Sequence, residues 1–293
     1  MARPSIVTEP RLTWEQAVGW LNDQPDMAEL SRAAYLDPPV AGAAKRYRES
    51  AEWAAVRALL PQSGASAPGR SKRRVLDLGA GNGIMSYALA ADGWDVTAVE
   101  PDPSLTVGAG AIRTLAAGTG VTIEVIEAFG EAIPLEAANF DAVIARQVLH
   151  HAADLDAFCR EMARLVRPGG TVITLRDHVI DGPASKAAFF KIHPLHHLYG
   201  GENAFRAEEY RTALLNAGLA ITKEFRSFDS VINYAPFGEL EIRREAENRL
   251  PTAIRWVATP VMRAIPFSLL TFFATYADRR PGRLVSYVAK RPL

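Results

Sequence analysis

Residues 75–90, with the sequence VLDLGAGNGIMSYALA, decide the fold class. A short apolar run broken only by Asp77 leads into three alternate glycines, Gly79, Gly81 and Gly83, and then into helix-forming residues. This order predicts a strand, a tight turn and a helix. Alternate glycines let the backbone approach a ligand where a Cβ would clash, and the helix points its free N–H groups at the turn. The stretch therefore predicts a ligand site.

The glycine spacing excludes a dinucleotide fingerprint. That fingerprint, G-x-G-x-x-G/A, would need glycine or alanine where Ile84 or Ser86 stands. The pattern present is D-x-G-x-G-x-G. The next apolar run, 94–99, ends in Glu100, about 20 residues past the first glycine, where a Rossmann-type fold places the carboxylate that holds a ribose diol. Turn, spacing and acidic strand end together favour a cofactor with a ribose over a purely structural turn.

The composition is that of a globular protein. The 293 residues are 48% hydrophobic and 23% charged, with a net charge of zero, and the length allows about two domains. A neutral chain lacks the basic excess of a nucleic-acid-binding surface. Cys159 is the single cysteine, which excludes an intrachain disulfide, and we expect a buried core residue there. The N-terminal residues lack an apolar signal region, so we expect no signal peptide and a cytoplasmic location.

From residue 75 the chain alternates strands and helices, which indicates a parallel sheet. The expected strands are 75–79, 94–99, 121–126, 140–145, 171–176, 220–226 and, closing the sheet, 285–290. The expected helices between them are 83–92, 103–117, 154–166 and 207–217. Residues 167–170, RPGG, end the helix 154–166 and turn into the fifth strand.

The D-x-G-x-G-x-G turn, Glu100 and the RPGG turn resemble the class I S-adenosylmethionine (SAM) dependent methyltransferases. The resemblance is to the small-molecule group typified by ubiquinone and menaquinone biosynthesis, methyltransferase type 11, and it covers residues 43–177 well and 205–226 loosely. It implies an α/β, doubly wound, Rossmann-like fold with a seven-stranded sheet of order 3-2-1-4-5-7-6. It also implies SAM as the cofactor and a small molecule as the acceptor.

Three parts of the chain are expected around this core. They are an N-terminal helical lid at 1–60 with helices at 13–22, 26–36 and 43–60, the SAM-binding core at 61–228 and 284–293, and a helical cap at 229–283 inserted between strands six and seven. Tyr35 and Tyr47 are the lid aromatics that we consider for the site, with core packing as the alternative.

The resemblance also implies the cofactor contacts. The glycines pass beneath the methionyl part and the ribose, Asp77 organises the turn, and Glu100 takes the ribose hydroxyls. The loop after strand three often reads G-D-A-E-x-L-P-F in this group, its Asp contacting the adenine, but here Phe129 replaces that Asp and is expected to pack on the purine face. Arg146 is expected near the methionine end. The full expected set is Asp77, Gly79, Gly81, Gly83, Glu100, Pro101, Phe129, Gly130 and Arg146.

All six histidines lie between positions 150 and 197. His150 and His151 follow strand four and Asp177 follows strand five, so a doubly wound sheet gathers them at its carboxyl edge, where ligands bind. A histidine is the natural general base for a hydroxyl acceptor, and a neighbouring carboxylate would orient it and stabilise its charged form. We therefore expect His150, His151 and Asp177 to be catalytic. Helix capping or packing is the alternative for the histidines, and Arg176 competes with Asp177 for the carboxylate's position.

His193, His196 and His197 are possible metal ligands together with Asp177 or Asp181. No cysteine joins them, and a site needs three or four well-placed ligands. We expect no metal and prefer a role in lining the acceptor pocket.

These features predict methylation of a hydroxyl group on a natural product, a sugar, or a prenylated or aromatic compound. Residues 146–149 read RQVL and lack the Asp/Asn-Pro-Pro-Tyr signature of amide and adenine methylation. A C- or N-methyltransferase of a lipid-like substrate stays open. A non-catalytic SAM-fold protein whose cap serves assembly is the competing class.

The apolar run 253–276 contains two arginines and two prolines, which argue against a membrane-spanning helix. The preceding residues, 239–249, read as a solvated helix of mixed charge. We expect the prolines to split the run into short pieces that wall the acceptor pocket. A homodimer interface and a peripheral membrane contact are the alternatives.

Overall fold

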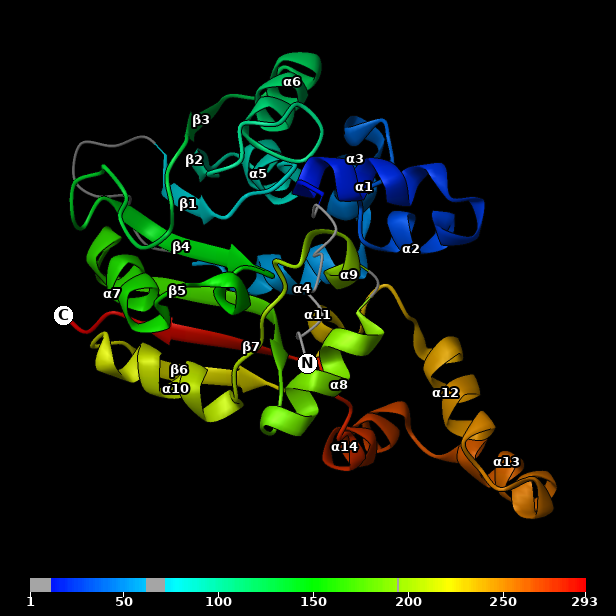
Figure 1. The fold of residues 1–293 in the computed structure, drawn as a ribbon. Helices are drawn as coiled ribbons and strands as arrows, with labels where there is room; N and C mark the ends of the chain where they lie inside the picture. Colours follow the sequence, from blue (N-terminus) through cyan, green and yellow to red (C-terminus); the bar gives the residue numbers. More distant parts are fainter. Residues whose placement is uncertain (1–11, 62–71, 194) are drawn as a thin grey trace, which may run out of the picture.

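The computed structural model describes residues 12–61, 72–193 and 195–293. A seven-stranded sheet of order β3-β2-β1-β4-β5-β7-β6 forms its centre (Figure 1), as predicted. β7 runs antiparallel to both of its neighbours, and the other pairs are parallel. The strands are β1 (Arg74–Leu78), β2 (Asp95–Val99), β3 (Ile123–Ile126), β4 (Phe140–Arg146), β5 (Val166–Val179), β6 (Ala220–Phe225) and β7 (Arg283–Lys290).

Helices cover both faces of the sheet. α5 (Ile84–Ala91) and α6 (Ala109–Thr119) lie on one face, while α7 (Leu155–Leu165) and α10 (Ala207–Asn216) lie on the other. The central strands are apolar on both sides, as a parallel sheet with two covered faces requires. Cys159 is buried in the α7 core, as expected.

The N-terminal region is helical, but its third predicted helix is two helices. α1 (Trp14–Asp23) starts with the expected capping box of Thr13 and Gln16, followed by η1 (Pro25–Met27) and α2 (Ala28–Ala33). The predicted helix 43–60 breaks into α3 (Val40–Glu49) and α4 (Ala51–Leu59). Ser50 adopts an extended conformation between them, and its hydroxyl accepts a hydrogen bond from the Trp53 N–H at 3.0 Å. The side chain thus caps a new helix instead of continuing the old one.

Three further differences concern the ends of elements. α6 starts at residue 109 rather than 103, because the Asp102 carboxylate accepts the Ser104 N–H at 2.8 Å and forms a turn there. β5 starts early, because Val166 already pairs with Phe140 before a register shift. The connection after β5 also contains two helices that the sequence analysis did not predict, α8 (Pro183–Ile192) and α9 (His196–Tyr199).

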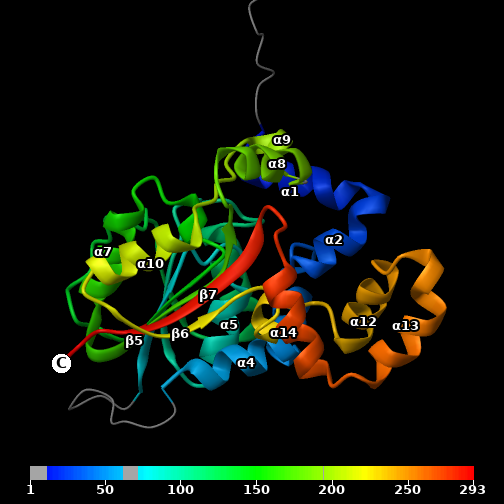
Figure 2. The ribbon, with the colours of Figure 1, turned by 90° about the horizontal axis from the view of Figure 1, so that it is seen from below.

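The insertion after β6 is helical, as predicted, but its second half does not lie over the sheet as expected. It comprises α11 (Val231–Tyr234), α12 (Glu239–Asn248), α13 (Thr252–Ala264) and α14 (Phe267–Ala277). α12 and α13 extend away from the sheet in both views (Figures 1 and 2). Trp256 is 78% exposed and Phe273 is 60% exposed. These residues of the apolar run 253–276 are therefore not buried against the rest of the chain, contrary to the expectation of the sequence analysis. Pro260 lies inside α13, and only Pro266 separates two helices.

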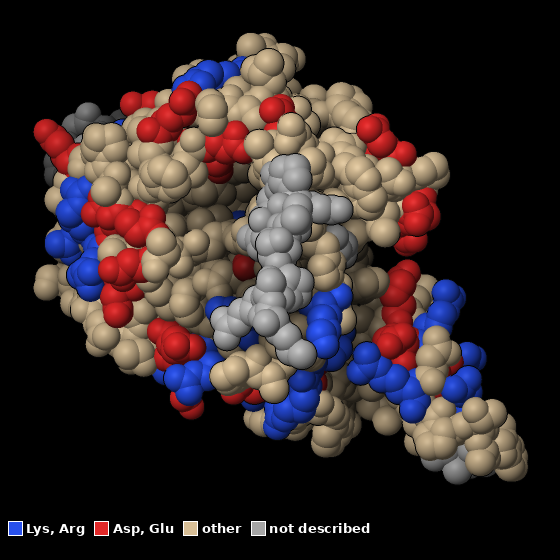
Figure 3. Space-filling model, in the orientation of Figure 1, with Lys and Arg blue, Asp and Glu red and all other residues tan. Residues whose placement is uncertain are grey.

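The surface mixes charges of both signs on the face seen in Figure 3, which accords with the neutral chain. Across the described residues, none of the helices combines the length and the apolar character needed to cross a bilayer.

Candidate active site

The glycine turn connects β1 to α5 and is held in a conformation that favours glycine. Gly79, Gly81 and Gly83 all have positive φ angles, between 55° and 82°. A Cβ on Gly79 would lie 2.5 Å from a methyl carbon of Val148, which follows β4. The turn and the segment after β4 are therefore in direct contact, and a side chain at Gly79 would force them apart.

Glu100 is fixed beside this turn. One carboxylate oxygen accepts the Gly81 N–H at 2.8 Å, and the other accepts the Asp102 N–H at 2.9 Å. The carboxyl group is buried, and this burial raises the pKa of Glu100. The acidic strand end and the glycine turn are thus joined by a direct hydrogen bond, while the contact of Glu100 with a ribose stays a prediction.

Asp77 lies beneath the turn and is fully buried. Its carboxylate accepts a hydrogen bond from the Ser86 hydroxyl at 2.6 Å, which connects the end of β1 to the first turn of α5. Burial raises the pKa of Asp77 to about 6. These contacts fit the expected role of organising the turn.

The predicted adenine side is an open loop after β3. Phe129 is 71% exposed, and Pro101 after β2 is exposed too, so both are accessible to a ligand. Packing alone explains the glycine at position 130, because a Cβ there would lie 2.1 Å from a ring carbon of Phe158. Contact of these residues with a cofactor stays a prediction.

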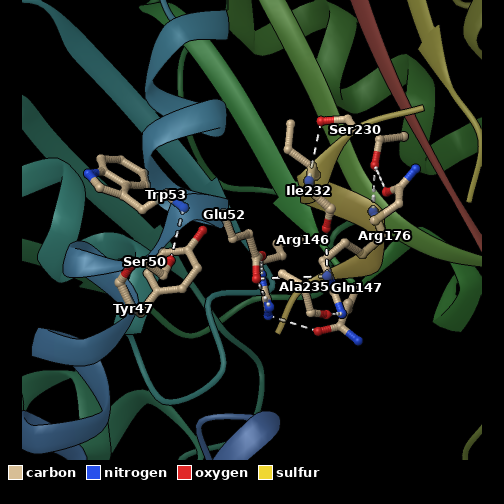
Figure 4. A network of polar contacts seen from close by, with 12 residues as sticks. Tyr47, Ser50, Glu52, Trp53, Arg146, Gln147, Arg176, Ser230, Ile232 and Ala235 are labelled. Carbon is tan, nitrogen blue, oxygen red and sulfur yellow. Dashed lines mark hydrogen bonds and ion pairs between the residues drawn. The ribbon is translucent and has the colours of Figure 1, made fainter. Parts of the chain in front are cut away.

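Arg146 belongs to a buried ion network that connects the N-terminal helices to the sheet (Figure 4). Its guanidinium donates to the two Glu52 oxygens of α4 at 2.7 and 3.3 Å, and to the Gln147 side-chain oxygen at 2.8 Å. Arg176 lies 3.8 Å from the same carboxylate and donates to backbone carbonyls of α11. Glu52 was missed in the sequence analysis, because its partners are far away along the chain.

The lid tyrosines lie against the same arginine. The ring centroids of Tyr35 and Tyr47 are 6.0 and 5.3 Å from the Arg146 guanidinium carbon, and both tyrosines are buried. The Tyr35 carbonyl also accepts the Asn82 side-chain amide at 2.8 Å. Packing thus explains these aromatics, and it brings the lid to the edge of the glycine turn.

His150 and Asp177 form the predicted histidine–carboxylate pair. The His150 Nδ1 atom lies 3.0 Å from Asp177 Oδ1, and the same oxygen accepts the backbone N–H groups of Val148 and His150 at 3.2 and 3.3 Å. Because Oδ1 is an acceptor, Nδ1 carries the proton and Nε2 is free to accept one. A register shift in β5 gives Arg176 and Asp177 different surroundings, which decides between them in favour of Asp177.

The electrostatics of this pair differ from the expectation. Burial raises the pKa of Asp177 to about 8. Burial also lowers the pKa of His150, and the neighbouring histidines lower it further. The Asp177 carboxyl group therefore orients the ring through Oδ1 but contributes little negative charge near neutral pH. His150 is neutral, and the expected stabilisation of its charged form by Asp177 is wrong for this structure.

Further histidines gather around one acid that the sequence analysis missed. Glu202, after α9, is 8% exposed, and its carboxylate oxygens lie 3.7 Å from His150 Nε2 and 3.7 Å from His193 Nε2. His178 of β5 lies 5.7 Å from His193 between ring centroids. His151 is exposed, with Nδ1 3.1 Å from a backbone carbonyl. The only signal for Glu202 is its place in the histidine-bearing connection.

A glycine turn after β1, an acid after β2 and the strand order 3-2-1-4-5-7-6 define a class I methyltransferase fold. Residues 76–174 match the methyltransferase domain family Methyltransf_11. This match covers about a third of the chain, and it falls on the part of the sheet that carries the glycine turn and the acid after β2.

Curated relatives and solved structures agree with this assignment. The chain is similar to ubiquinone biosynthesis O-methyltransferases of Sinorhizobium fredii, with 32% identity over 51% of this chain and 60% of that protein, and of Methylocella silvestris, with 42% identity over 33% of this chain and 37% of that protein. The chain thus spans well under two thirds of the length of either relative.

Two solved structures show the same fold at low identity. The geranyl diphosphate C-methyltransferase of Streptomyces coelicolor, in complex with S-adenosyl-L-homocysteine, has a TM-score of 0.56 at 15% identity, covering 96% of this chain and all of that one. The [4+2]-cyclase SpnF has a TM-score of 0.54 at 18% identity, covering 86% and 82%. Since one neighbour is named a cyclase, the fold alone does not define the reaction.

Proposed function

We propose that this protein is a SAM-dependent methyltransferase that methylates a hydroxyl oxygen of a small molecule. The observation that carries the proposal is the neutral His150 held by Asp177 at 3.0 Å, on a segment that contacts the glycine turn through Val148. A proton acceptor for the substrate thus lies beside the cofactor turn. The names of the curated relatives support O-methylation.

The residues of the turn fit SAM. Any Cβ on Gly79 would collide with Val148, so this glycine lets the turn lie directly against the segment that carries His150. Glu100 uses each carboxylate oxygen for one backbone N–H, which leaves lone pairs for the two ribose hydroxyls. Phe129 is free to pack on the adenine. When bound, SAM supplies a methyl group already activated on a sulfonium.

The residues on the acceptor side would then align the hydroxyl and take its proton. In-line alignment of the two reactants supplies much of the rate, up to about 7–11 kcal/mol. Bound SAM would supply the methyl group and would keep the electron pair of the broken carbon–sulfur bond on sulfur, so the acceptor oxygen would have to lose its proton. The hydroxyl proton would pass to His150 Nε2, and the hydrogen bond from Nδ1 to Asp177 at 3.0 Å would hold the ring in the tautomer that can accept it.

A turnover assay across hydroxyl, amine and carbon acceptors, reading S-adenosylhomocysteine, tests this function. His150→Asn keeps an N–H donor for Asp177 but has no Nε2, so we expect kcat to fall about 10²–10⁴-fold with little change in SAM affinity. His197→Asn is the control, because His197 is exposed and lies outside the Glu202 cluster.

The product identifies the reaction. A new methyl ether supports the proposal, whereas a new carbon–carbon or carbon–nitrogen bond would assign C- or N-methylation instead. SAM binding without S-adenosylhomocysteine from any acceptor would favour the non-catalytic class. Full activity of His150→Asn would remove His150 from the mechanism.

The exposed apolar face of α13 and α14 is, in our proposal, covered by a second copy of the chain. Large exposed apolar patches mark interaction surfaces. Anionic lipid is less suited, because three arginines of α12 and α13 and the turn between them are already paired with acids: Arg243 with Glu239, Arg249 with Glu245 and Arg263 with Glu247. We also keep the cytoplasmic location in the proposal, since the buried free thiol of Cys159 suits a reducing compartment.

A further inference from the structure

The cluster around Glu202 has a feature that methyl transfer does not require. Glu202 is 8% exposed, and its Oε2 atom has no hydrogen-bond partner among the described residues. Its Oε1 atom accepts the Tyr199 hydroxyl and faces the His193 Nε2 atom at 3.7 Å. A buried carboxylate with a free oxygen is costly unless a cation compensates it. The charge of Glu202 therefore points to a missing positive partner.

The surrounding histidines offer lone pairs rather than positive charge. The His193 Nε2 atom faces the Glu202 carboxylate at 3.7 Å, and the His178 ring lies 5.7 Å from the His193 ring between centroids. The His178 Nδ1–H donates to the Gly282 carbonyl at 2.8 Å, which leaves Nε2 as an acceptor. Metal-binding histidines have this arrangement, in which the second ring nitrogen donates to a carbonyl or carboxylate and fixes the tautomer.

We propose that Glu202, His178 and His193 form a binding site for a divalent transition-metal ion of the zinc class. Their ligand atoms lie within 4.8 Å of one another. Bonds of about 2.0–2.2 Å around a tetrahedral zinc place its ligands about 3.3–3.5 Å apart. The 3.7 Å between Glu202 and His193 is close to this spacing, so small side-chain movements would complete the site.

The ligand set differs from the one considered in the sequence analysis. Of the histidine trio, only His193 takes part, because His196 stacks on Phe190 at 4.1 Å and His197 is exposed. A second group of possible ligands, His150, His151 and Glu202, shares the same acid. We favour His178 and His193, because His151 is exposed and would lose more side-chain freedom on binding.

Three protein ligands leave one coordination position open, as in catalytic zinc sites. In a role that rests on the proposed function, this position takes the hydroxyl oxygen of the acceptor. His150 Nε2 lies 3.7 Å from Glu202, so a bound hydroxyl falls within reach of this base. The ion would lower the pKa of that hydroxyl and leave its proton to His150. Ion binding itself does not depend on methyl transfer.

Metal binding is tested on the full chain, without SAM or acceptor. The protein is stripped with a chelator, titrated with Co²⁺ while the visible spectrum is followed, and then competed with Zn²⁺. We expect one ion per chain, with the intense visible bands of tetrahedral Co²⁺ and a raised unfolding temperature. Glu202→Gln preserves shape and the acceptor for Tyr199, and it should weaken binding by more than about 100-fold, since even losing an outer-shell partner costs 10–100-fold.

The variants separate the two ligand groups. His178→Asn and His193→Asn should each weaken binding, whereas His151→Asn and His197→Asn should not. Loss of binding in His151→Asn with none in His178→Asn would overturn our ligand set in favour of the other group. No Co²⁺ or Zn²⁺ binding by the wild-type chain at millimolar ion, or equal binding by Glu202→Gln, would overturn the metal site. Both results leave the SAM turnover assay unaffected, so the two proposals fail separately.

Discussion

Replacing Glu52 by alanine should destabilise the protein strongly. Glu52 is 1% exposed, and its two oxygens bind the Arg146 guanidinium at 2.7 and 3.3 Å. Arg176 is also buried, 3.8 Å from the same carboxylate. The variant would leave two buried cations without their shared counter-charge. Removing one partner of a buried ion pair costs about 3–5 kcal/mol.

Urea unfolding followed by circular dichroism measures this cost. With a denaturant slope of about 3 kcal/mol per molar urea, the midpoint should fall by about 1–1.7 M. Glu49→Ala is the matched control, because Glu49 is an exposed acid at the end of the preceding helix, where substitution changes stability by about 0.5 kcal/mol or less.

A double-mutant cycle identifies the cause. Glu52→Met combined with Arg146→Met removes both charges and keeps apolar volume, so its loss of stability should be clearly smaller than the sum of the single losses. A midpoint shift below 0.3 M for Glu52→Ala, or full additivity in the cycle, would refute the reasoning that this ion pair holds α4 on the sheet.

Three other predictions concern the glycine turn and the exposed helix α13. Burial holds the pKa of Asp77 at about 6, above its ordinary 3.8, so the folded state binds this proton more tightly and loses stability as pH rises from about 4 through 6. Asp77→Asn should remove about 3 kcal/mol of that pH dependence, measured by urea unfolding without cofactor between pH 4 and 7, and an unchanged slope would contradict it. Gly79→Ala should lower the unfolding free energy by about 2–4 kcal/mol, because it forces a Cβ to within 2.5 Å of Val148 at a φ of +67°. Gly93→Ala is the control and should cost clearly less, because only its φ is unfavourable. Trp256→Ser should turn a dimer into a monomer in sedimentation while leaving SAM affinity unchanged, whereas a wild-type monomer that floats with anionic vesicles would show that a membrane covers this face.

The sequence by itself determined the features that neighbouring residues specify together, such as the glycine turn and the type of sheet. The glycine spacing after Asp77 and the acid at position 100 identified the turn and the acidic strand end beside it, because strand, turn and helix follow one another directly in the chain. The alternation of apolar runs and helical segments indicated a parallel sheet, and the order of its strands followed from the family resemblance alone. The pairing of His150 with Asp177 was also predictable, because the carboxyl ends of parallel strands meet at one edge.

Only the tertiary structure decided which distant charges meet. Glu52 and Arg146 are 94 positions apart, and neither lies in a motif that names the other. Arg176 and Asp177 were equivalent candidates until a register shift in β5 gave them different partners, and such a shift leaves no mark in the hydrophobic pattern. The apolar residues of α13 revealed a need for a partner but not its position, since the hydrophobic effect is non-directional. Glu202 reaches the histidines by the path of the chain after β5, and that path depends on packing far beyond any local sequence pattern.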